Sequence, residues 1–216
     1  MDNEPPDGSL TGGPGGLTLA QAAERFGAYC WVERRLFELT GAWAAEANAP
    51  EARIHLDVVS GQHGWHAGLW ADRLPVLDGV DHDALIRPGG PAMGPLLDEL
   101  SRQPDTTARL AGLYRVVVPR LIVTYGRHLR RARAAADAPA VRALRLVRRD
   151  EVEAWQAGEA LLEQLLVRPE DAALAAAVEA RLEGTVVTEW GGSGLLAWPV
   201  DPGGEACVEG GPGHVT

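Results

Sequence analysis

Helical periodicity over four long segments is the feature that most limits how this chain can fold. Apolar residues recur every three to four positions in each segment, which indicates helices that bury one face. We expect these helices over residues 18–46, 50–73, 105–136 and 139–167. The apolar–polar alternation typical of a strand is missing, so the sequence predicts an all-α fold.

Signals at the ends of the segments support these boundaries. Thr18 and Gln21 have the spacing of a capping box, in which two side chains satisfy backbone N–H groups at the start of a helix. Pro50 is tolerated in a first turn, whereas Pro75 cannot continue a helix, so the two prolines bound the second segment. Pro119 lies inside the third segment, and we expect it to kink that helix because it has no N–H to donate.

A long connection separates the second and third segments. Residues 75–104 hold several Pro and Gly residues, with short helical patches at 81–86 and 93–102. The four helices therefore form two hairpins joined by one long crossover, which is a recognised layout of four-helix bundles. A shorter, Ala-rich fifth helix over 169–183 is expected to pack outside this core.

Both ends of the chain differ in composition from its middle. Residues 1–17 and 184–216 are rich in Gly and Pro and lack helical periodicity, so we expect flexible tails around a single helical domain over 18–183. The second tail contains Trp190 and Trp198. Two tryptophans in such a tail indicate a segment that docks, with the bundle itself as the favoured surface.

Composition and cysteine placement indicate a cytoplasmic protein. Hydrophobic residues make up 46% of the chain, which is enough for a core without disulfides, and Cys30 and Cys207 are far apart in the sequence, as suits reduced thiols. Residues 1–16 lack the basic start and apolar run of a secretory leader. The longest apolar stretch, residues 116–123, is much shorter than the roughly 20 residues that a bilayer-spanning helix needs. We therefore expect neither a leader nor a membrane span.

Four ionisable residues interrupt the apolar faces of the helices. Glu33 lies in the apolar stripe of the first helix, and Glu151 lies in that of the fourth. His63 and His66 share the apolar face of the second helix. Because a lone buried charge is costly, we expect the four side chains to converge near the middle of the bundle.

These positions resemble the ligand pattern of the ferritin-like di-iron family, in which two helices each give a Glu and two others each give Glu-x-x-His. The resemblance covers residues 18–166. Glu33 matches the ligand of the first helix, His66 the histidine of the second, and Glu151 the glutamate of the fourth. The resemblance implies a ferritin-like four-helix bundle with a metal site between its helices.

The ligand set departs from that family on three helices. His63 stands where the second helix would give a glutamate, and Ala154 stands where the fourth would give a histidine. The third helix offers Leu121, Ile122 or Tyr125 in place of its glutamate. Two cations held close together need more anionic oxygens than the two remaining glutamates supply, so the sequence predicts no ordinary di-iron centre.

Two interpretations of the four residues stay open. One is a single metal ion, with iron as the expected cofactor, held by His63, His66 and a glutamate as in non-haem iron sites. The other is a metal-free polar network, in which the histidines and Arg148 compensate the buried charges of Glu33 and Glu151. A third alternative is that the inward-facing positions are misassigned by one residue along the helix.

The leading functional hypothesis is a ferritin-like protein with a degenerate metal site that binds a partner or a small ligand. Phenylacetyl-CoA oxygenase assemblies are similar as a family, since they pair an iron-bearing ferritin-like subunit with a relative that lacks the metal. The alternative is a non-haem iron oxygenase or hydroxylase that resembles the tRNA-hydroxylase branch or the CoA-ester oxygenases. Iron storage fits less well because ligands are missing. No catalytic residue is assigned, and a homo-oligomer is compatible with each of these functions.

Arginines gather in one part of an otherwise acidic chain. Residues 115–149 hold ten arginines and one acid, a local net charge of +9, although the whole chain carries −10. Such a run is either a solvated face or a dock for an acidic protein or an anionic ligand. The candidate dock consists of Arg130, Arg131, Arg145 and Arg149, at the end of the third helix and the start of the fourth. The overall negative charge argues against nucleic acid as a partner, with tRNA as the exception that the resemblance leaves open.

The other histidines and the tryptophans are read as packing residues. His55, His82 and His128 have no partner at ligand spacing, so we expect them in surface or packing roles. Five tryptophans are expected to fill the core or to line a pocket: Trp31, Trp43, Trp65, Trp70 and Trp155.

Overall fold

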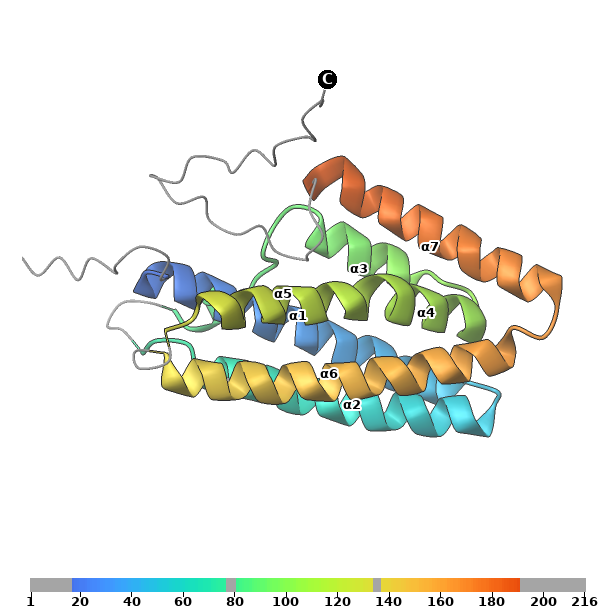
Figure 1. Ribbon diagram of the computed structural model, residues 1–216, viewed down its shortest axis with the longest axis horizontal. Coiled ribbons are helices and arrows are strands. Elements are labelled where there is room, and N and C mark those ends of the chain that lie inside the picture. The colour runs from blue at the N-terminus through green and yellow to red at the C-terminus, as the bar shows by residue number, and fades with distance from the viewer. Residues whose placement is uncertain (1–16, 77–80, 134–136, 191–216) are drawn as a thin grey trace, which may run out of the picture.

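The computed structural model describes residues 17–76, 81–133 and 137–190, and every regular element within these ranges is helical (Figure 1). The all-α prediction is therefore confirmed for this part of the chain. The elements are α1 (Leu19–Glu46), α2 (Pro50–Ala71), the short 3-10 helix η1 (Asp83–Leu85), α3 (Met93–Ser101), α4 (Thr106–Gly112), the π-helical segment η2 (Leu113–Val117), α5 (Val118–Arg131), α6 (Ala138–Leu165) and α7 (Pro169–Trp190). None of these helices is both long and apolar enough to cross a lipid bilayer.

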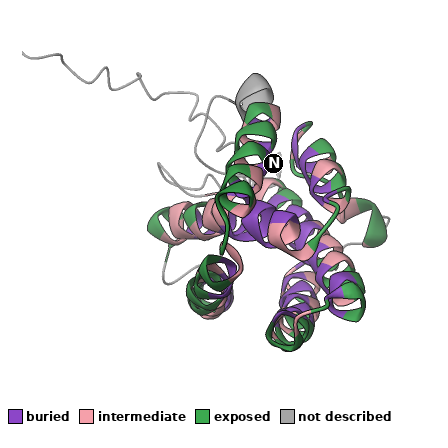
Figure 2. Cartoon of the chain, turned by 90° about the vertical axis from the view of Figure 1, so that its right-hand side faces the viewer, coloured by how far each residue is buried: buried purple, intermediate pink, exposed green. Residues whose placement is uncertain are grey.

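Two antiparallel helix pairs make up the body of the molecule. α1 runs along α2 over most of its length, and α5 runs beside α6 in the opposite direction (Figure 1). Between the pairs, the chain from α2 to α4 returns to the far end of the molecule, so α2 and the α4–α5 rod point the same way. The buried residues lie on the faces that the helices turn toward one another (Figure 2).

The starts of the helices follow their capping signals. The side chain of Thr18 accepts a hydrogen bond from the backbone N–H of Gln21, and the side chain of Gln21 accepts one from the N–H of Thr18, at 3.2 and 2.9 Å. This is the predicted capping box. α2 begins at Pro50 as expected and ends at Ala71, two residues before the predicted end.

The third predicted helix is a continuous rod of three segments, α4, η2 and α5. In the π-helical segment η2 the backbone N–H of Val118 donates to the carbonyl of Leu113, five residues back. Pro119 follows at once and has no N–H to give to the carbonyl four residues before it. The disruption expected at Pro119 is thus a π turn on its N-terminal side, in which backbone N–H groups bond the carbonyl five residues back instead of four.

Aromatic side chains fill the centre between the two helix pairs. Tyr29, Trp70, Tyr114 and Tyr125 are all fully buried. The ring of Tyr125 lies edge-on to Tyr29, with centroids 4.9 Å apart, and stacks on Trp70 at 5.6 Å.

Two of the five tryptophans expected in the core face solvent instead. Trp43 and Trp70 are buried, whereas Trp65 is 50% exposed and Trp155 is 37% exposed. Trp65 is the neighbour of a buried residue on α2, and one step along a helix turns a side chain by about 100° away from that face. Of the three histidines expected in packing or surface roles, His128 is buried and shares a hydrogen bond with the hydroxyl of Tyr29 at 3.1 Å.

α7 is longer and more buried than expected. Its predicted end at residue 183 is wrong, because the helix continues to Trp190. One face of it packs on α3 and α4 through Ala175, Val178, Leu182 and Val186, which are 0 to 1% exposed. The remainder of the two predicted tails, with Trp198 and Cys207, lies outside the described residues, while Cys30 is a buried free thiol.

Close approach of two helices requires a glycine at position 158. Gly158 of α6 lies directly against the ring of Tyr114, and a Cβ atom there would collide with the ring carbons. Because Tyr114 is fully buried and its hydroxyl is bonded to His55 at 2.6 Å, the ring has no free direction in which to move.

Replacing Gly158 with alanine is therefore expected to lower the free energy of unfolding by about 1–3 kcal/mol through overpacking. The matched control is Gly61→Ala on α2, where nothing lies within 4 Å of the added methyl group. Because alanine is the better helix former, the control should be neutral or stabilising by up to about 1 kcal/mol. Urea denaturation followed by circular dichroism measures both, and equal effects would contradict the close contact at Tyr114.

Candidate metal centre

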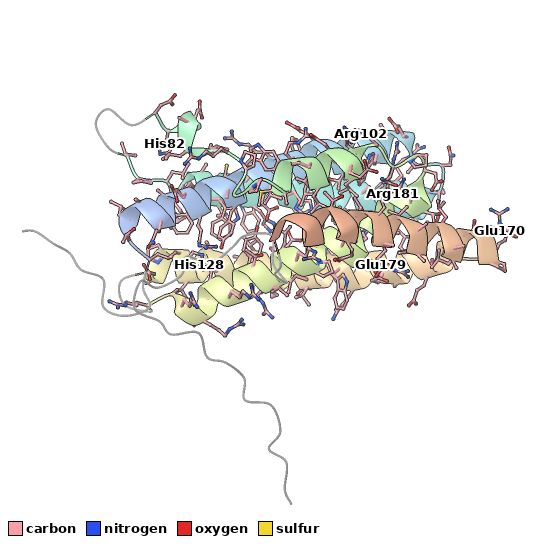
Figure 3. The ribbon with its side chains drawn as sticks, turned by 90° about the horizontal axis from the view of Figure 1, so that it is seen from above. His82, Arg102, His128, Glu170, Glu179 and Arg181 are labelled. Carbon is pink, nitrogen blue, oxygen red and sulfur yellow. The ribbon has the colours of Figure 1, made fainter. Side chains whose placement is uncertain are left out.

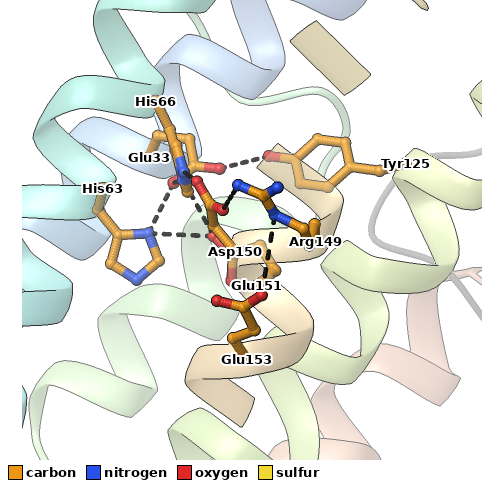
Figure 4. A network of polar contacts seen from close by, with 8 residues as sticks. All are labelled: Glu33, His63, His66, Tyr125, Arg149, Asp150, Glu151 and Glu153. Atoms are coloured by element: carbon orange, nitrogen blue, oxygen red, sulfur yellow. Dashed lines mark hydrogen bonds and ion pairs between the residues drawn. The ribbon is translucent and has the colours of Figure 1, made fainter. Parts of the chain in front are cut away.

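Four buried ionisable side chains meet between the two helix pairs. Glu33 comes from α1, His63 and His66 from α2, and Glu151 from α6 (Figure 4). Each offers one nitrogen or carboxylate oxygen, and these atoms all lie within 4.8 Å of one another. None of the four residues is more than 3% exposed. The structure thus brings together the residues that the sequence pattern singled out.

Helix geometry explains why these side chains share one volume. His63 and His66 are three residues apart, so they project from the same face of α2. Glu33 lies four residues after the buried Tyr29 and three before the buried Leu36, and Glu151 lies one turn after the buried Val147. Each carboxylate is therefore carried on the buried face of a long helix.

Glu33 is the most fully bonded member of the site. Its Oε2 lies 2.6 Å from Nδ1 of His63, and its Oε1 accepts a hydrogen bond from the hydroxyl of Tyr125 at 2.5 Å (Figure 4). Of the three residues considered for the ligand position on the third helix, Tyr125 is therefore the one that reaches the site. Burial, followed by the negative charge of Glu33, raises the pKa of Tyr125 well above its usual range. The phenol therefore stays protonated and donates a hydrogen bond to Glu33.

His66 lies between three carboxylates. Its Nδ1 is 3.3 Å from an oxygen of Glu151 and 3.6 Å from an oxygen of Glu33, and its Nε2 is 3.4 Å from an oxygen of Asp150. A carboxylate on the outer nitrogen orients the ring and favours the tautomer that leaves the inner nitrogen free to coordinate a metal. Asp150 was missed by the sequence analysis. The available signal was its position beside an inward-facing glutamate.

Charge balance without a metal depends on the two histidines. Burial opposes ionisation of Glu33, but attraction to His66 and the hydrogen bond from His63 lower its pKa to about 2. Burial likewise opposes protonation of His66, but the negative charges of Glu33 and Glu151 raise its pKa to about 10. The pKa of His63 is raised for the same reason, with Glu151 as the main attracting charge. In the metal-free protein, the buried carboxylates therefore face protonated imidazoles.

Arg148, which we expected to help neutralise the glutamates, does not do so. Its side chain is exposed, and its Nε lies beside Gly126 of α5 rather than beside Glu151.

The donor set fits one metal ion. Nδ1 of His66 and both carboxylate oxygens of Glu151 are buried and have no hydrogen-bond partner among the described residues. Buried polar atoms nearly always have a hydrogen-bond partner. Three buried atoms that lack one and lie close together are therefore an arrangement that a cation would complete. Two imidazole nitrogens with two carboxylates suit a first-row divalent metal. They are too few for two ions held side by side.

The four arginines of the candidate dock lie on the outside of the molecule. Arg130 and Arg131 end α5, and Arg145 and Arg149 lie on the outward face of α6. All four are exposed. Arg149 pairs with Asp150 at 3.4 Å and approaches Glu153 at 3.8 Å, which ties this arginine to the outer edge of the metal site (Figure 4).

Loss of the Glu33 carboxylate should destabilise the metal-free protein strongly, because both histidines and Tyr125 would lose a buried partner. After chelation, Glu33→Ala is expected to lower the free energy of unfolding by about 3–5 kcal/mol. Glu33→Gln should cost less, since the amide oxygen still accepts from Tyr125.

The control for this change is Glu38→Ala on the same helix. Glu38 is 58% exposed, so its loss should alter the free energy of unfolding by no more than about 0.5 kcal/mol. Urea titration of the chelated variants gives the three values. A Glu33→Ala variant as stable as Glu38→Ala would show that Glu33 is not the paired, buried carboxylate described above.

No family model matches this chain, and neither a curated protein nor a solved structure shows a significant similarity to it. Any conclusion about function therefore rests on the geometry and chemistry of the site.

Proposed function

We propose that this chain is a divergent ferritin-like bundle protein that holds one transition-metal ion between Glu33, His63, His66 and Glu151. The observation that carries the proposal is the convergence of four buried donors, three of whose atoms have no hydrogen-bond partner. A metal-free network would leave those atoms without a hydrogen bond, and only the charge of imidazoles 3.3 and 3.4 Å from Glu151 would offset the cost of burying them.

The arrangement of the helices supports the ferritin-like assignment. Two antiparallel pairs are joined by one long connection, and the donors come from α1 and α2 of the first pair and α6 of the second. The third helix of the bundle, which ends in α5, contributes Tyr125, whose hydroxyl donates a hydrogen bond to Glu33 and is not itself among the four candidate ligands. Donors carried on three helices of a four-helix bundle support a relation to the di-iron family, with fewer ligands than that family has.

Iron is the metal that this donor set favours. Imidazole suits iron, zinc, nickel and copper, while carboxylates suit harder cations, and a pair of histidines with carboxylates is the pattern of non-haem iron(II) sites. Structural zinc sites most often use cysteine, and the buried Cys30 is not part of the cluster.

Burial of the site favours a protein whose metal is structural or vestigial over an enzyme. All four donors are at most 3% exposed, so a substrate would reach the ion only after helices had moved. The leading role is then that of a metal-degenerate ferritin-like protein that binds a partner or small ligand. The alternative, a non-haem iron oxygenase or hydroxylase, is supported by one observation: four protein donors leave coordination positions open on a six-coordinate ion. An iron(II) ion at the site would supply dioxygen activation.

Metal analysis tests the site directly. The protein as purified is expected to contain about one ion per chain, measured by inductively coupled plasma mass spectrometry, because ions held by buried donors are retained through purification. His66→Ala should lose it. His82→Ala, a change of the same type at a partly exposed histidine whose Nε2 lies 3.4 Å from the carbonyl oxygen of Leu74, should keep it. Wild type without metal, and unable to bind added iron(II), cobalt(II) or zinc(II), would refute the proposal.

The arginines at the end of α5 and on α6 support a second part of the proposal, the docking of an acidic protein or an anionic ligand. Arg130 and Arg145 are exposed and form no ion pair within the described part of the chain. Exposed cations without partners attract anions at low ionic strength and lose that attraction as salt screens them.

Heparin chromatography measures this attraction. The wild type should be retained at low salt despite its net charge of −10, and replacing Arg130, Arg131, Arg145 and Arg149 with glutamine should abolish retention. A variant with Arg87 and Arg102 changed to glutamine serves as control, since both side chains are exposed elsewhere, at 64% and 68%. Wild type that flows through at low salt, or a control that loses retention equally, would remove the dock.

A further inference from the structure

A second cavity, apart from the metal site, lies at one end of the bundle. It occupies about 220 Å³ where α1 and α6 begin and α5 ends. His128 lines it and lies toward this end of the molecule in Figure 3, whereas Arg102 lies in the opposite half. The proposed metal function makes no use of this cavity.

One side of the cavity is apolar and rigid. Leu19, Ala22 and Phe26 follow one another along a face of α1 and line this side. Leu19 is 63% exposed, so the rim is apolar as well. Phe26 is held in place by stacking on His128 at 5.8 Å and on Trp70 at 6.0 Å. The position of the Phe26 ring is therefore fixed before anything binds.

The other side of the cavity carries positive charge. Arg73 and Arg131 line it, against a single carboxylate, Asp137. The Asp137 side chain already accepts a hydrogen bond from the backbone N–H of Arg133 at 2.8 Å. Nε of Arg73 is buried and has no hydrogen-bond partner among the described residues. An anion in the cavity would lie beside the two arginine side chains and be attracted by their charge.

The remaining polar group, His128, adds no charge. Burial, and next the positive charge of Arg25, lower the pKa of His128 to about 4, so the ring is neutral at physiological pH. Burial raises the pKa of Tyr29 to about 12, so its hydroxyl is also neutral, and it shares a hydrogen bond with Nδ1 of His128 at 3.1 Å. The cavity is thus lined by a neutral histidine, by an apolar face of α1 and by two arginines.

We infer that this cavity binds a small carboxylate with an apolar body, whose charged group meets Arg73 and whose body lies against Phe26. Arginine and carboxylate form strong, directional hydrogen bonds, and Arg131 adds attraction from the rim. At roughly 30 Å³ per water-sized group, the volume holds about seven such groups, which suits a molecule the size of benzoate rather than a long-chain acid or a nucleotide.

Isothermal titration calorimetry with benzoate and benzyl alcohol tests this inference, because the two probes share a ring and differ in charge. Benzoate should bind, and benzyl alcohol should bind at least about tenfold more weakly, which corresponds to about 1.4 kcal/mol. Arg73→Gln should weaken benzoate about tenfold while leaving benzyl alcohol unchanged, since only the charged contact is lost.

Two further variants separate the cavity from the molecule's general charge. Ala22→Leu fills the cavity and should weaken both probes, whereas Arg102→Gln removes an exposed arginine in the opposite half of the molecule and should weaken neither. A melting curve for each variant confirms that it is folded. The inference is overturned if benzoate does not bind to the wild type, if benzyl alcohol binds as tightly, or if Arg102→Gln acts like Arg73→Gln. Because the metal ligands are intact in all of these variants, metal content stays an independent measurement.

Discussion

The desolvation of two carboxylates inside a helical bundle is the constraint on which the rest of the structure depends. Glu33 and Glu151 are 0 and 1% exposed, and moving such groups out of water costs several kcal/mol each unless compensating charge lies close. No arginine supplies that charge within the described residues at the site. That charge comes from imidazole protons or from a metal ion. His63 and His66 must therefore lie close to the carboxylates, Tyr125 must donate to Glu33, and the helices that carry these residues must pack closely.

The sequence revealed the four central residues because each interrupts an apolar stripe. That signal is strong for charged or histidine side chains, and it located Glu33, His63, His66 and Glu151 without knowledge of the packing. It is weak for tyrosine, since a tyrosine on an apolar face reads as core, and only contact with Glu33 shows that Tyr125 belongs to the site. Asp150 was missed for a different reason. It lies beside the buried face of α6 and acts on the site through His66.

Helix limits were predictable where local chemistry sets them and less so where packing does. The capping box at Thr18 is a local device and was found from the sequence. The π turn before Pro119 and the extension of α7 past residue 183 depend on neighbours. η2 carries Tyr114 against Gly158 of α6, and α7 continues because Val186 is buried on the helices beneath it. Tertiary contacts of this kind override the Gly content that suggested a tail.

Burial of the four donors also affects how fast a bound metal ion would leave, and not only how tightly it would be held. An ion held between α1, α2 and α6 would be surrounded by donors that are at most 3% exposed, so it would leave when the helices part, and the rate of that opening would set its residence time. Which metal a given molecule carries would then record the ions present while the chain was folding more than those around it afterwards. A chelator that binds the ion more tightly would still have to wait for the protein to open.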